Sequence, residues 1–347
     1  MICVLSPAKT MRSAIDANAF KLICEPSVPI QLDKSNQLAE TLKRKSRKEL
    51  KTLCEVSDNL AGHVESLYKE FVLSNGGDIV MSRSAQAALA FNGPAFQGLK
   101  ADSLETAQGE LLQKHLRILT GLYGAVRPGD MIQEHRLCMS SKLSVDTHKD
   151  LYEYWGDSIA NDILLDLNNQ LDAIEAATGR RPPPLVVNCA SQEYARAVLP
   201  HLEASGVLVI ECVFLDAGKV KSVYAKRARG LMARFVCTLG GLHSGEEAHL
   251  LHGFCSEGYN VSATQSTPTR VVFTRASPPS GSTCAGRKQA VVSAKALGES
   301  CVGESRTGNG SEAGSVSAST CGTKRVDKTQ ADTALKKRPG KRTRSRY

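Results

Sequence analysis

The 347-residue chain lacks any long hydrophobic run, since no stretch of 18 consecutive apolar residues occurs in it. A helix that crosses a membrane needs about 20 such residues, so the sequence excludes a membrane-spanning helix. The apolar run at residues 1–5 is too short for the hydrophobic region of a secretory signal and has no basic flank. We therefore expect an intracellular, cytoplasmic protein that has no membrane partner.

The motifs of metal and nucleotide sites are also missing. The eight histidines form no H-x-x-x-H or H-E-x-x-H pattern, and the 11 cysteines form no C-x-x-C pair. Glycine-rich phosphate loops of the Walker or dinucleotide type are absent as well. The sequence thus predicts no metal and no cofactor. The odd number of cysteines indicates free thiols in a reducing compartment, with Cys3, Cys189 and Cys212 buried in apolar runs.

The body of the chain has no net charge, and the net positive charge lies in its last fifth. Residues 276–347 hold 14 of the 44 Lys and Arg but 5 of the 35 Asp and Glu, which leaves 30 of each sign elsewhere. That segment is rich in Ser, Gly, Thr and Ala and has no periodicity, a composition that cannot bury a core. We therefore divide the chain into a folded domain, residues 1–275, and a disordered basic tail, residues 276–347.

Two basic blocks in the tail, Lys324-Arg325 and Lys336–Arg342, have the spacing of a bipartite nuclear import signal. A nucleic-acid-binding arm and a merely solubilising tail are the alternatives. Nuclear localisation is therefore an alternative to the cytoplasm.

The body alternates between strand-like and helical patterns. Buried strands are expected at residues 2–5, 185–189 and 207–214, a more exposed one at 220–224, and closing strands at 254–259 and 270–274. Helices are expected at residues 103–119, 159–174 and 226–239, with three more between 33 and 73, one of them capped by Ser46 and Glu49. Interleaving of this kind predicts a mixed α/β (α+β) single domain around one mixed sheet.

Gly121 and Gly124 bracket a two-residue tip at the end of the helical pattern, and Arg127 follows in a second turn. Glycines at this spacing predict a tight hairpin between two helices, because glycine suits the left-handed conformation that ends a helix. Backbone N–H groups at such an entry can face a phosphate. A packed corner without a ligand is the alternative.

The sharpest charge feature of the body lies on the helix at 226–239. Helical spacing places Lys226, Arg227, Gly230 and Arg234 on one face, with Arg229 at its edge. Gly230 suits a position that another backbone or a phosphate must approach closely. With Lys9, Arg127 and Arg136 these side chains could line one phosphate-binding cleft, whereas a solvated face is the alternative. The same two interpretations apply to the basic run at residues 43–51.

Ser6 and Lys9 have the Ser-x-x-Lys spacing of some acylating enzymes, although no partner motif follows. Lys9 is better explained as an anion ligand at the end of a strand. Asp157 and Glu193 follow strand–turn junctions and would be the acid–base groups of an enzyme, whereas capping and ion pairing are the alternatives.

Six motifs in order make the chain resemble one family across roughly residues 1–275. They are LSPAKT (5–10), LTGLYGAVRP (119–128), YWGD (154–157), NCASQEY (188–194), YAKRARGLMARF (224–235) and EGY (257–259). The chain is similar to the YaaA peroxide-stress protein family, with Cys189 and Gln192 replacing residues that are usually apolar and acidic. The added tail suggests a eukaryotic member.

The resemblance implies an unusual α/β fold with a helix-hairpin-helix element, DNA binding through a positively charged cleft, and protection from hydrogen peroxide by limiting free iron and oxidative DNA damage. Our lead hypothesis is therefore a DNA-binding protein of the peroxide stress response that is not an enzyme. An enzyme that acts on a nucleotide or other phosphorylated substrate in the same cleft is the alternative, and a module recruited by its tail is a third.

Overall fold

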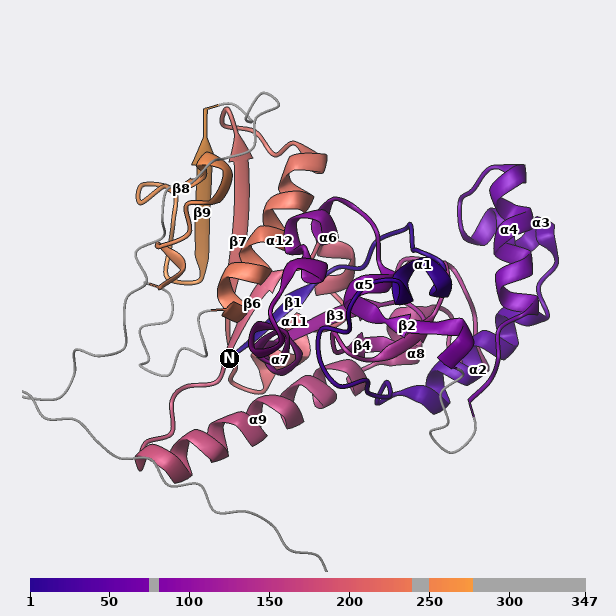
Figure 1. Ribbon diagram of the computed structural model, residues 1–347, viewed down its shortest axis with the longest axis horizontal. Helices are drawn as coiled ribbons and strands as arrows, with labels where there is room; N and C mark the ends of the chain where they lie inside the picture. The colour runs from indigo at the N-terminus through magenta and orange to yellow at the C-terminus, as the bar shows by residue number, and fades with distance from the viewer. Residues whose placement is uncertain (75–80, 239–249, 277–347) are drawn as a thin grey trace, which may run out of the picture. The chain divides into compact units, whose positions relative to one another are not determined.

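The computed structural model describes residues 1–74, 81–238 and 250–276 and is built around a seven-stranded sheet (Figure 1). In the order β4-β3-β1-β6-β7-β9-β8, its strands are Gly124–Val126, Leu116–Thr120, Ile2–Leu5, Leu185–Cys189, Leu208–Asp216, Arg270–Arg275 and Asn260–Val261. The five inner strands run parallel, and the two edge strands, β4 and β8, pair antiparallel. The predicted mixed α/β architecture is confirmed.

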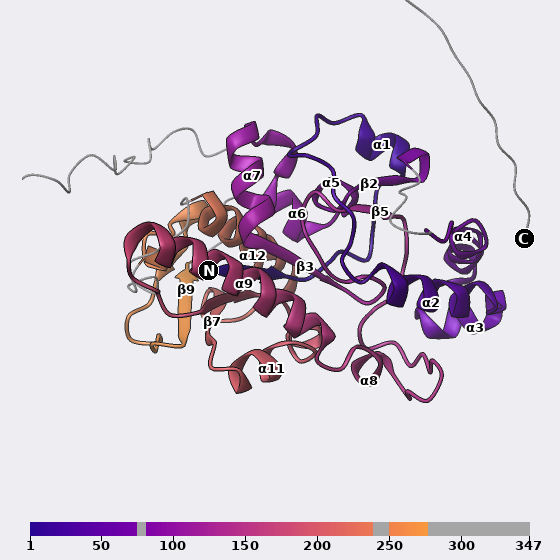
Figure 2. The ribbon, with the colours of Figure 1, turned by 90° about the horizontal axis from the view of Figure 1, so that it is seen from below.

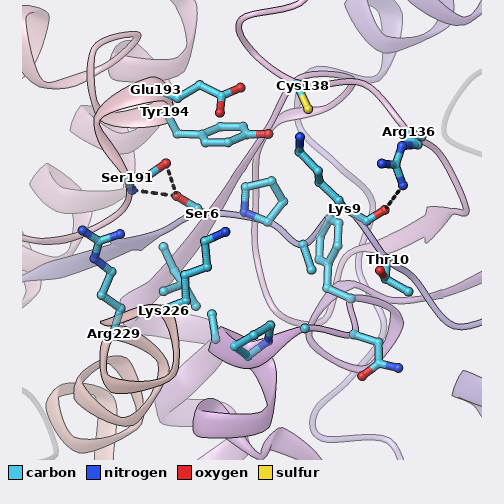
Figure 3. A pocket seen from close by; sticks show the side chains of 18 of the residues that line it. Ser6, Lys9, Thr10, Arg136, Cys138, Ser191, Glu193, Tyr194, Lys226 and Arg229 are labelled. Atoms are coloured by element: carbon cyan, nitrogen blue, oxygen red, sulfur yellow. Dashed lines mark hydrogen bonds between the residues drawn. The ribbon is translucent and has the colours of Figure 1, made fainter. Parts of the chain in front are cut away.

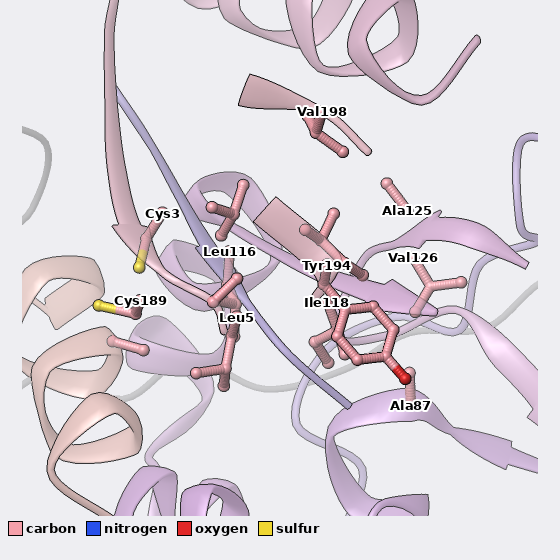
Figure 4. Close-up of a cluster of buried hydrophobic side chains, with 14 of the residues drawn as sticks. Cys3, Leu5, Ala87, Leu116, Ile118, Ala125, Val126, Cys189, Tyr194 and Val198 are labelled. Carbon is pink, nitrogen blue, oxygen red and sulfur yellow. The ribbon is translucent and has the colours of Figure 1, made fainter. Parts of the chain in front are cut away.

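Helices cover both faces of the sheet, which explains why β1, β3 and β6 are buried along their whole length. Figure 2 shows α9 and α11 on one side of the strands and α6, α7 and α12 on the other. These helices span Ser158–Thr178, Leu199–Ala204, Pro94–Leu99, Thr106–His115 and Ser222–Thr238. Every residue of β1, β3 and β6 is buried, as parallel strands between two helical layers require. Figure 4 shows part of this core, where Leu5, Leu116 and Ile118 pack together.

The helical region between residues 33 and 73 has three helices, as predicted. They are α2 (Leu32–Lys43), α3 (Arg47–Leu53) and α4 (Asp58–Lys69). Ser46 and Glu49 form the expected capping box, in which each side chain accepts a hydrogen bond from the other residue's backbone N–H.

The remaining elements are short and lie in the connections. They are α1 (Ala14–Asn18), η1 (Met81–Arg83), β2 (Ser84–Gln86), α5 (Ala87–Ala90), η2 (Ala101–Ser103), β5 (Met131–Gln133), α8 (Leu151–Trp155), α10 (Gln192–Ala195) and η3 (Ser256–Gly258). Strands β2 and β5 form a separate antiparallel pair.

The predicted helix-hairpin-helix element is wrong, because residues 116–126 form a β-hairpin instead. Helix α7 ends at His115, and β3 then pairs with β4 across the turn that Gly121 begins. Tyr123 closes this turn by donating its N–H to Thr120 Oγ1. The apolar run was compatible with helical spacing, but a central parallel strand is apolar on both faces and shows no alternation.

Two further expectations differ from the structure. Residues 222–224 belong to α12 and not to a strand, and residues 254–259 include the η3 turn, so that β8 begins only at Asn260. The predicted disordered tail and its basic blocks lie outside the described residues. Among the residues that are described, no helix is long and apolar enough to cross a membrane.

Candidate functional site

A cavity of about 250 Å³ lies at the carboxyl ends of β1 and β6, the two central strands of the sheet. The next strand of this sheet after β1 is β3, which lies on one side of β1. The next strand after β6 is β7, which lies on the opposite side of the β1–β6 pair. Loops that leave neighbouring parallel strands in opposite directions open a crevice, which is where ligands bind in open α/β sheets. The topology therefore places this cavity where a ligand site is expected.

The two loops that open the cavity are tied together by hydrogen bonds at its floor. Ser191 donates its backbone N–H to Ser6 Oγ at 2.7 Å, and Ser6 Oγ donates to Ser191 Oγ at 3.1 Å (Figure 3). The Ser6 hydroxyl is therefore engaged in holding the loops, and neither bond joins it to Lys9 as Ser-x-x-Lys chemistry would require.

Four basic side chains converge on this cavity from three parts of the chain. Lys9 follows β1, Arg136 follows β5, and Lys226 and Arg229 come from α12 (Figure 3). Glu193 is the single acidic residue of the lining. Within the described residues, none of the four cations forms an ion pair with a carboxylate, so their charge is available to an anionic ligand.

Arg136 shows this availability most clearly. One of its terminal nitrogens donates to the Lys9 carbonyl oxygen at 3.0 Å, while its Nε is buried and has no hydrogen-bond partner among the described residues. A buried donor without a partner costs roughly 1–3 kcal/mol, more for a charged group. A ligand oxygen at this position would remove that cost.

Three of the predicted cleft arginines are engaged elsewhere. Arg127 pairs with the buried Asp130 at 3.1 Å and donates to the Val28 carbonyl oxygen. Arg227 pairs with Glu257 at 2.7 Å. Arg234 donates to carbonyl oxygens at the end of α6, among them that of Leu99, which is a helix-capping role. None of the three lines the cavity.

The predicted glycines belong to the packing and not to the cavity. A Cβ atom at Gly230 would lie 1.7 Å from the Ala95 carbonyl oxygen, so this glycine lets α12 cross closely over α6. The sequence predicted that either another backbone or a phosphate approaches Gly230, and in the structure it is the backbone of α6. Gly121 and Gly124 are buried in the β-hairpin against Leu137 and Trp155. Their amides do not line the cavity.

The two candidate acids are separated in the fold. Glu193 lines the cavity and accepts hydrogen bonds from the backbone N–H and the hydroxyl of Ser140, at 3.1 and 2.9 Å. Asp157 is exposed at the start of α9 and does not line the cavity. A mechanism that uses both acids together therefore has no support from their placement.

A wider groove of about 820 Å³ adjoins the cavity and shares Lys9, Cys138 and Glu193 with it. Two lysines of the basic run at 43–51 line this groove. They are Lys45, which precedes α3, and Lys48, which lies in its first turn. Lys142 also lines this groove, and no sequence pattern singles it out because it stands alone in an irregular loop. Among the residues that line this groove, the other acids are Glu49, which pairs with Lys45 at 3.0 Å, and Glu55.

Apolar side chains such as Phe91 also line the cavity, and the buried titratable groups beside them are held in their neutral forms. Burial lowers the pKa of His135 to about 4, and its ring packs edge-on against Phe91 and Tyr123. Burial likewise raises the pKa of Tyr194 and of Cys138. A lining that combines free cations with apolar side chains suits a ligand with both an anionic group and a flat apolar part.

No group of three or more His, Cys, Asp or Glu within the described ranges is arranged to hold a metal ion. The fold and the site together define a class: an α/β protein with a cationic ligand cavity at the switch point of a mixed sheet.

The family follows from comparison with known proteins. Residues 1–265 match the family model described as peroxide stress protein YaaA, so the chain belongs to this family. A UPF0246 protein of Albidiferax ferrireducens is 38% identical over 282 residues, which cover 80% of this chain and 99% of the relative. UPF0246 proteins of Bordetella pertussis and Ruegeria pomeroyi are each 38% identical over 279 residues, covering 79% of this chain and 99% and 98% of the relatives. These relatives are bacterial.

Proposed function

We propose that the protein acts in the peroxide stress response by binding DNA through the phosphate backbone, and so limits oxidative DNA damage. The observation that carries the proposal is the convergence of Lys9, Arg136, Lys226 and Arg229, none of which pairs with a carboxylate of the described residues. Family membership supports the peroxide-stress role. Limitation of free iron rests on the family resemblance alone, and we assign no iron ligand in the described residues.

The basic groove beside the cavity supports a polymeric ligand. Lys45, Lys48 and Lys142 extend the positive charge beyond the cavity, and the shared Lys9 joins the two surfaces. An extended anion such as a DNA strand can contact both at once, whereas a small molecule fills one of them. Contacts of this kind are made to phosphates and carry no sequence information, so we propose binding that is independent of base sequence and sensitive to salt.

Duplex binding at low salt tests the proposal. The variant that combines Lys226→Gln with Arg229→Gln should bind a fluorescent duplex about tenfold or more weakly than the native chain, because each lost charge-assisted contact costs roughly 1.5–3 kcal/mol. Lys114→Gln, an exposed charge on α7 outside the cavity, is the matched control and should leave the affinity unchanged.

A chain shortened to end at Arg275 separates the body from the tail. The proposal requires this shortened chain to bind duplex at low salt and to lose affinity with the double substitution. If only the full chain binds, the basic tail is the DNA-binding element and the cavity is not.

An enzyme or a binding protein for a nucleotide or other phosphorylated small molecule is the second candidate. It is favoured by the position of the cavity at the carboxyl ends of parallel strands, and by the apolar side chains that also line it. Lys9 and Glu193 would then face the substrate. A mononucleotide that raises the melting temperature of the full chain, where a duplex does not, would decide for this candidate. No shift with the mononucleotide would exclude it.

A further inference from the structure

Three thiols meet inside the sheet, on neighbouring strands under α12. Cys3 lies in β1, Cys189 ends β6, and Cys212 lies in β7. The register that pairs Asn188 with Glu211 continues one residue further, which places Cys189 beside Cys212. Adjacent strands are about 4.8 Å apart, and a disulfide bond spans Cα atoms roughly 4.4–6.8 Å apart. This pair can therefore be bridged without moving the strands far.

Cys3 is less well placed for such a bridge. Leu5 is the residue of β1 that lies beside Cys189, so Cys3 stands two residues back along its strand. Figure 4 shows its sulfur near that of Cys189, but the diagonal separation between such residues is roughly 7–8 Å. Cys212 is thus the better partner for a covalent bond to Cys189.

Cys189 is also the member of this cluster that reaches the cavity. It lines the cavity together with Arg229, whereas Cys3 and Cys212 do not line it. Hydrogen peroxide is little larger than water, so it fits a cavity of about 250 Å³. Cys189 itself is fully buried, with an exposed fraction of 0%, so peroxide in the cavity reaches its sulfur only when the lining side chains move. The residue that borders the cavity is nevertheless the one with the best-placed thiol partner.

The electrostatic surroundings favour the same atom. Cys189 accepts hydrogen bonds from the thiols of Cys212 and Cys3 and faces the Arg229 charge, and these interactions lower its pKa. The pKa values of Cys3 and Cys212 are raised, by their hydrogen bonds to Cys189 and by burial. Among these three residues the thiolate, which is the reactive form, is therefore best stabilised at Cys189.

We propose that Cys189 is a site of oxidation by hydrogen peroxide and that Cys212 converts the product to a disulfide. The Cys189 thiolate attacks one peroxide oxygen, the O–O bond breaks, and the departing hydroxide takes a proton to become water. Cys189 is then a sulfenic acid. The Cys212 sulfur attacks the Cys189 sulfur, the S–O bond breaks, and the oxygen leaves as a second water with the thiol proton. Two thiols are oxidised and one peroxide is reduced to two waters.

Peptide mapping of the full native chain tests the proposal. The reduced protein is exposed to a small excess of hydrogen peroxide, its remaining thiols are alkylated under denaturing conditions, and its peptides are analysed by mass spectrometry. We expect a peptide pair linked through Cys189 and Cys212. Cys24→Ser, which removes a buried thiol outside the cluster, is the matched control and should keep the link.

A second variant detects the intermediate. In Cys212→Ser the sulfenic acid cannot be resolved by its neighbour, so dimedone should label Cys189 after peroxide treatment. The proposal is overturned if Cys189 stays a free thiol in the native chain while the exposed Cys255 is oxidised. A link from Cys189 to Cys3 in place of Cys212 would equally contradict it. Because the mapping of the native chain needs no substitution, a variant that fails to fold leaves the test intact.

Discussion

Arg227 and Arg229 stand two residues apart on α12, yet their surroundings give them different roles. Arg227 is paired with Glu257, so its charge is compensated, whereas Arg229 reaches the cavity with no carboxylate partner among the described residues. Helical spacing placed both arginines at one basic face of the helix. It could not predict which arginine is engaged, because Glu257 lies 30 residues further along the chain.

The same limit applies to the other cations of the site. Lys9 and Glu193 follow strands that the sequence predicts, so both could be named as candidates, and both line the cavity. Lys142 was missed because it stands in an irregular loop that only the tertiary fold brings to the groove. Asp157, in contrast, ends the motif YWGD (154–157) but lies outside the cavity.

His135 makes stability depend on pH in a defined window. Its pKa is lowered from 6.5 to about 4 by burial, so the unfolded chain binds a proton between these values and the folded chain does not. Stability should therefore fall as the pH falls from 6.5 to 4, by about 3 kcal/mol in all. Urea unfolding at several pH values measures this, and His135→Asn should flatten the dependence. An equal pH dependence in the variant would contradict the assignment.

At the scale of elements, the close crossing of α6 and α12 positions Lys226 and Arg229 over the sheet. Gly98 and Gly230 make the crossing possible, because a Cβ atom at either would meet backbone atoms of the other helix, at 2.2 and 1.7 Å. Backbone atoms cannot move aside as a flexible side chain can. The glycine in the charged face is therefore explained by packing.

Gly230→Ala should lower the free energy of unfolding by about 3 kcal/mol or more, because the added methyl forces the helices apart. Gly62→Ala in α4 is the matched control, since its methyl would meet only the flexible side chain of Arg47. There the gain in helix propensity is about 1 kcal/mol, so the control should be neutral or stabilising. Equal denaturation midpoints for the two variants would contradict the packing role.

The elements predicted correctly are those with strong local signals. The capping box at Ser46 fixed the start of α3, and the run Leu185–Cys189, apolar apart from Asn188, fixed both ends of β6. Residues 116–120 had no such signal, because a short, mostly apolar segment that includes Arg117 and Thr120 fits a buried strand as well as a helix. These residues form a strand because they pair with β1, and the paired residues are more than a hundred positions apart in the sequence.

At the scale of the whole molecule, the topology explains why the site lies where it does. Strand β1 begins the chain and stands between β3 and β6, so the crevice at its carboxyl end is framed by the loop that begins at Ser6 and the loop that holds Ser191. The motifs at both loops were visible in the sequence. Their juxtaposition was not, because it depends on the order of strands.

The salt dependence of duplex affinity tests the central claim most directly. The logarithm of the binding constant falls with the logarithm of salt concentration by about 0.9 for each phosphate contact. Lys226→Gln with Arg229→Gln should therefore reduce this slope by about 2, whereas Lys114→Gln with Lys221→Gln, two exposed charges outside the cavity, should leave it unchanged. Equal slopes for the native chain and both double variants would show that the cavity cations do not contact DNA.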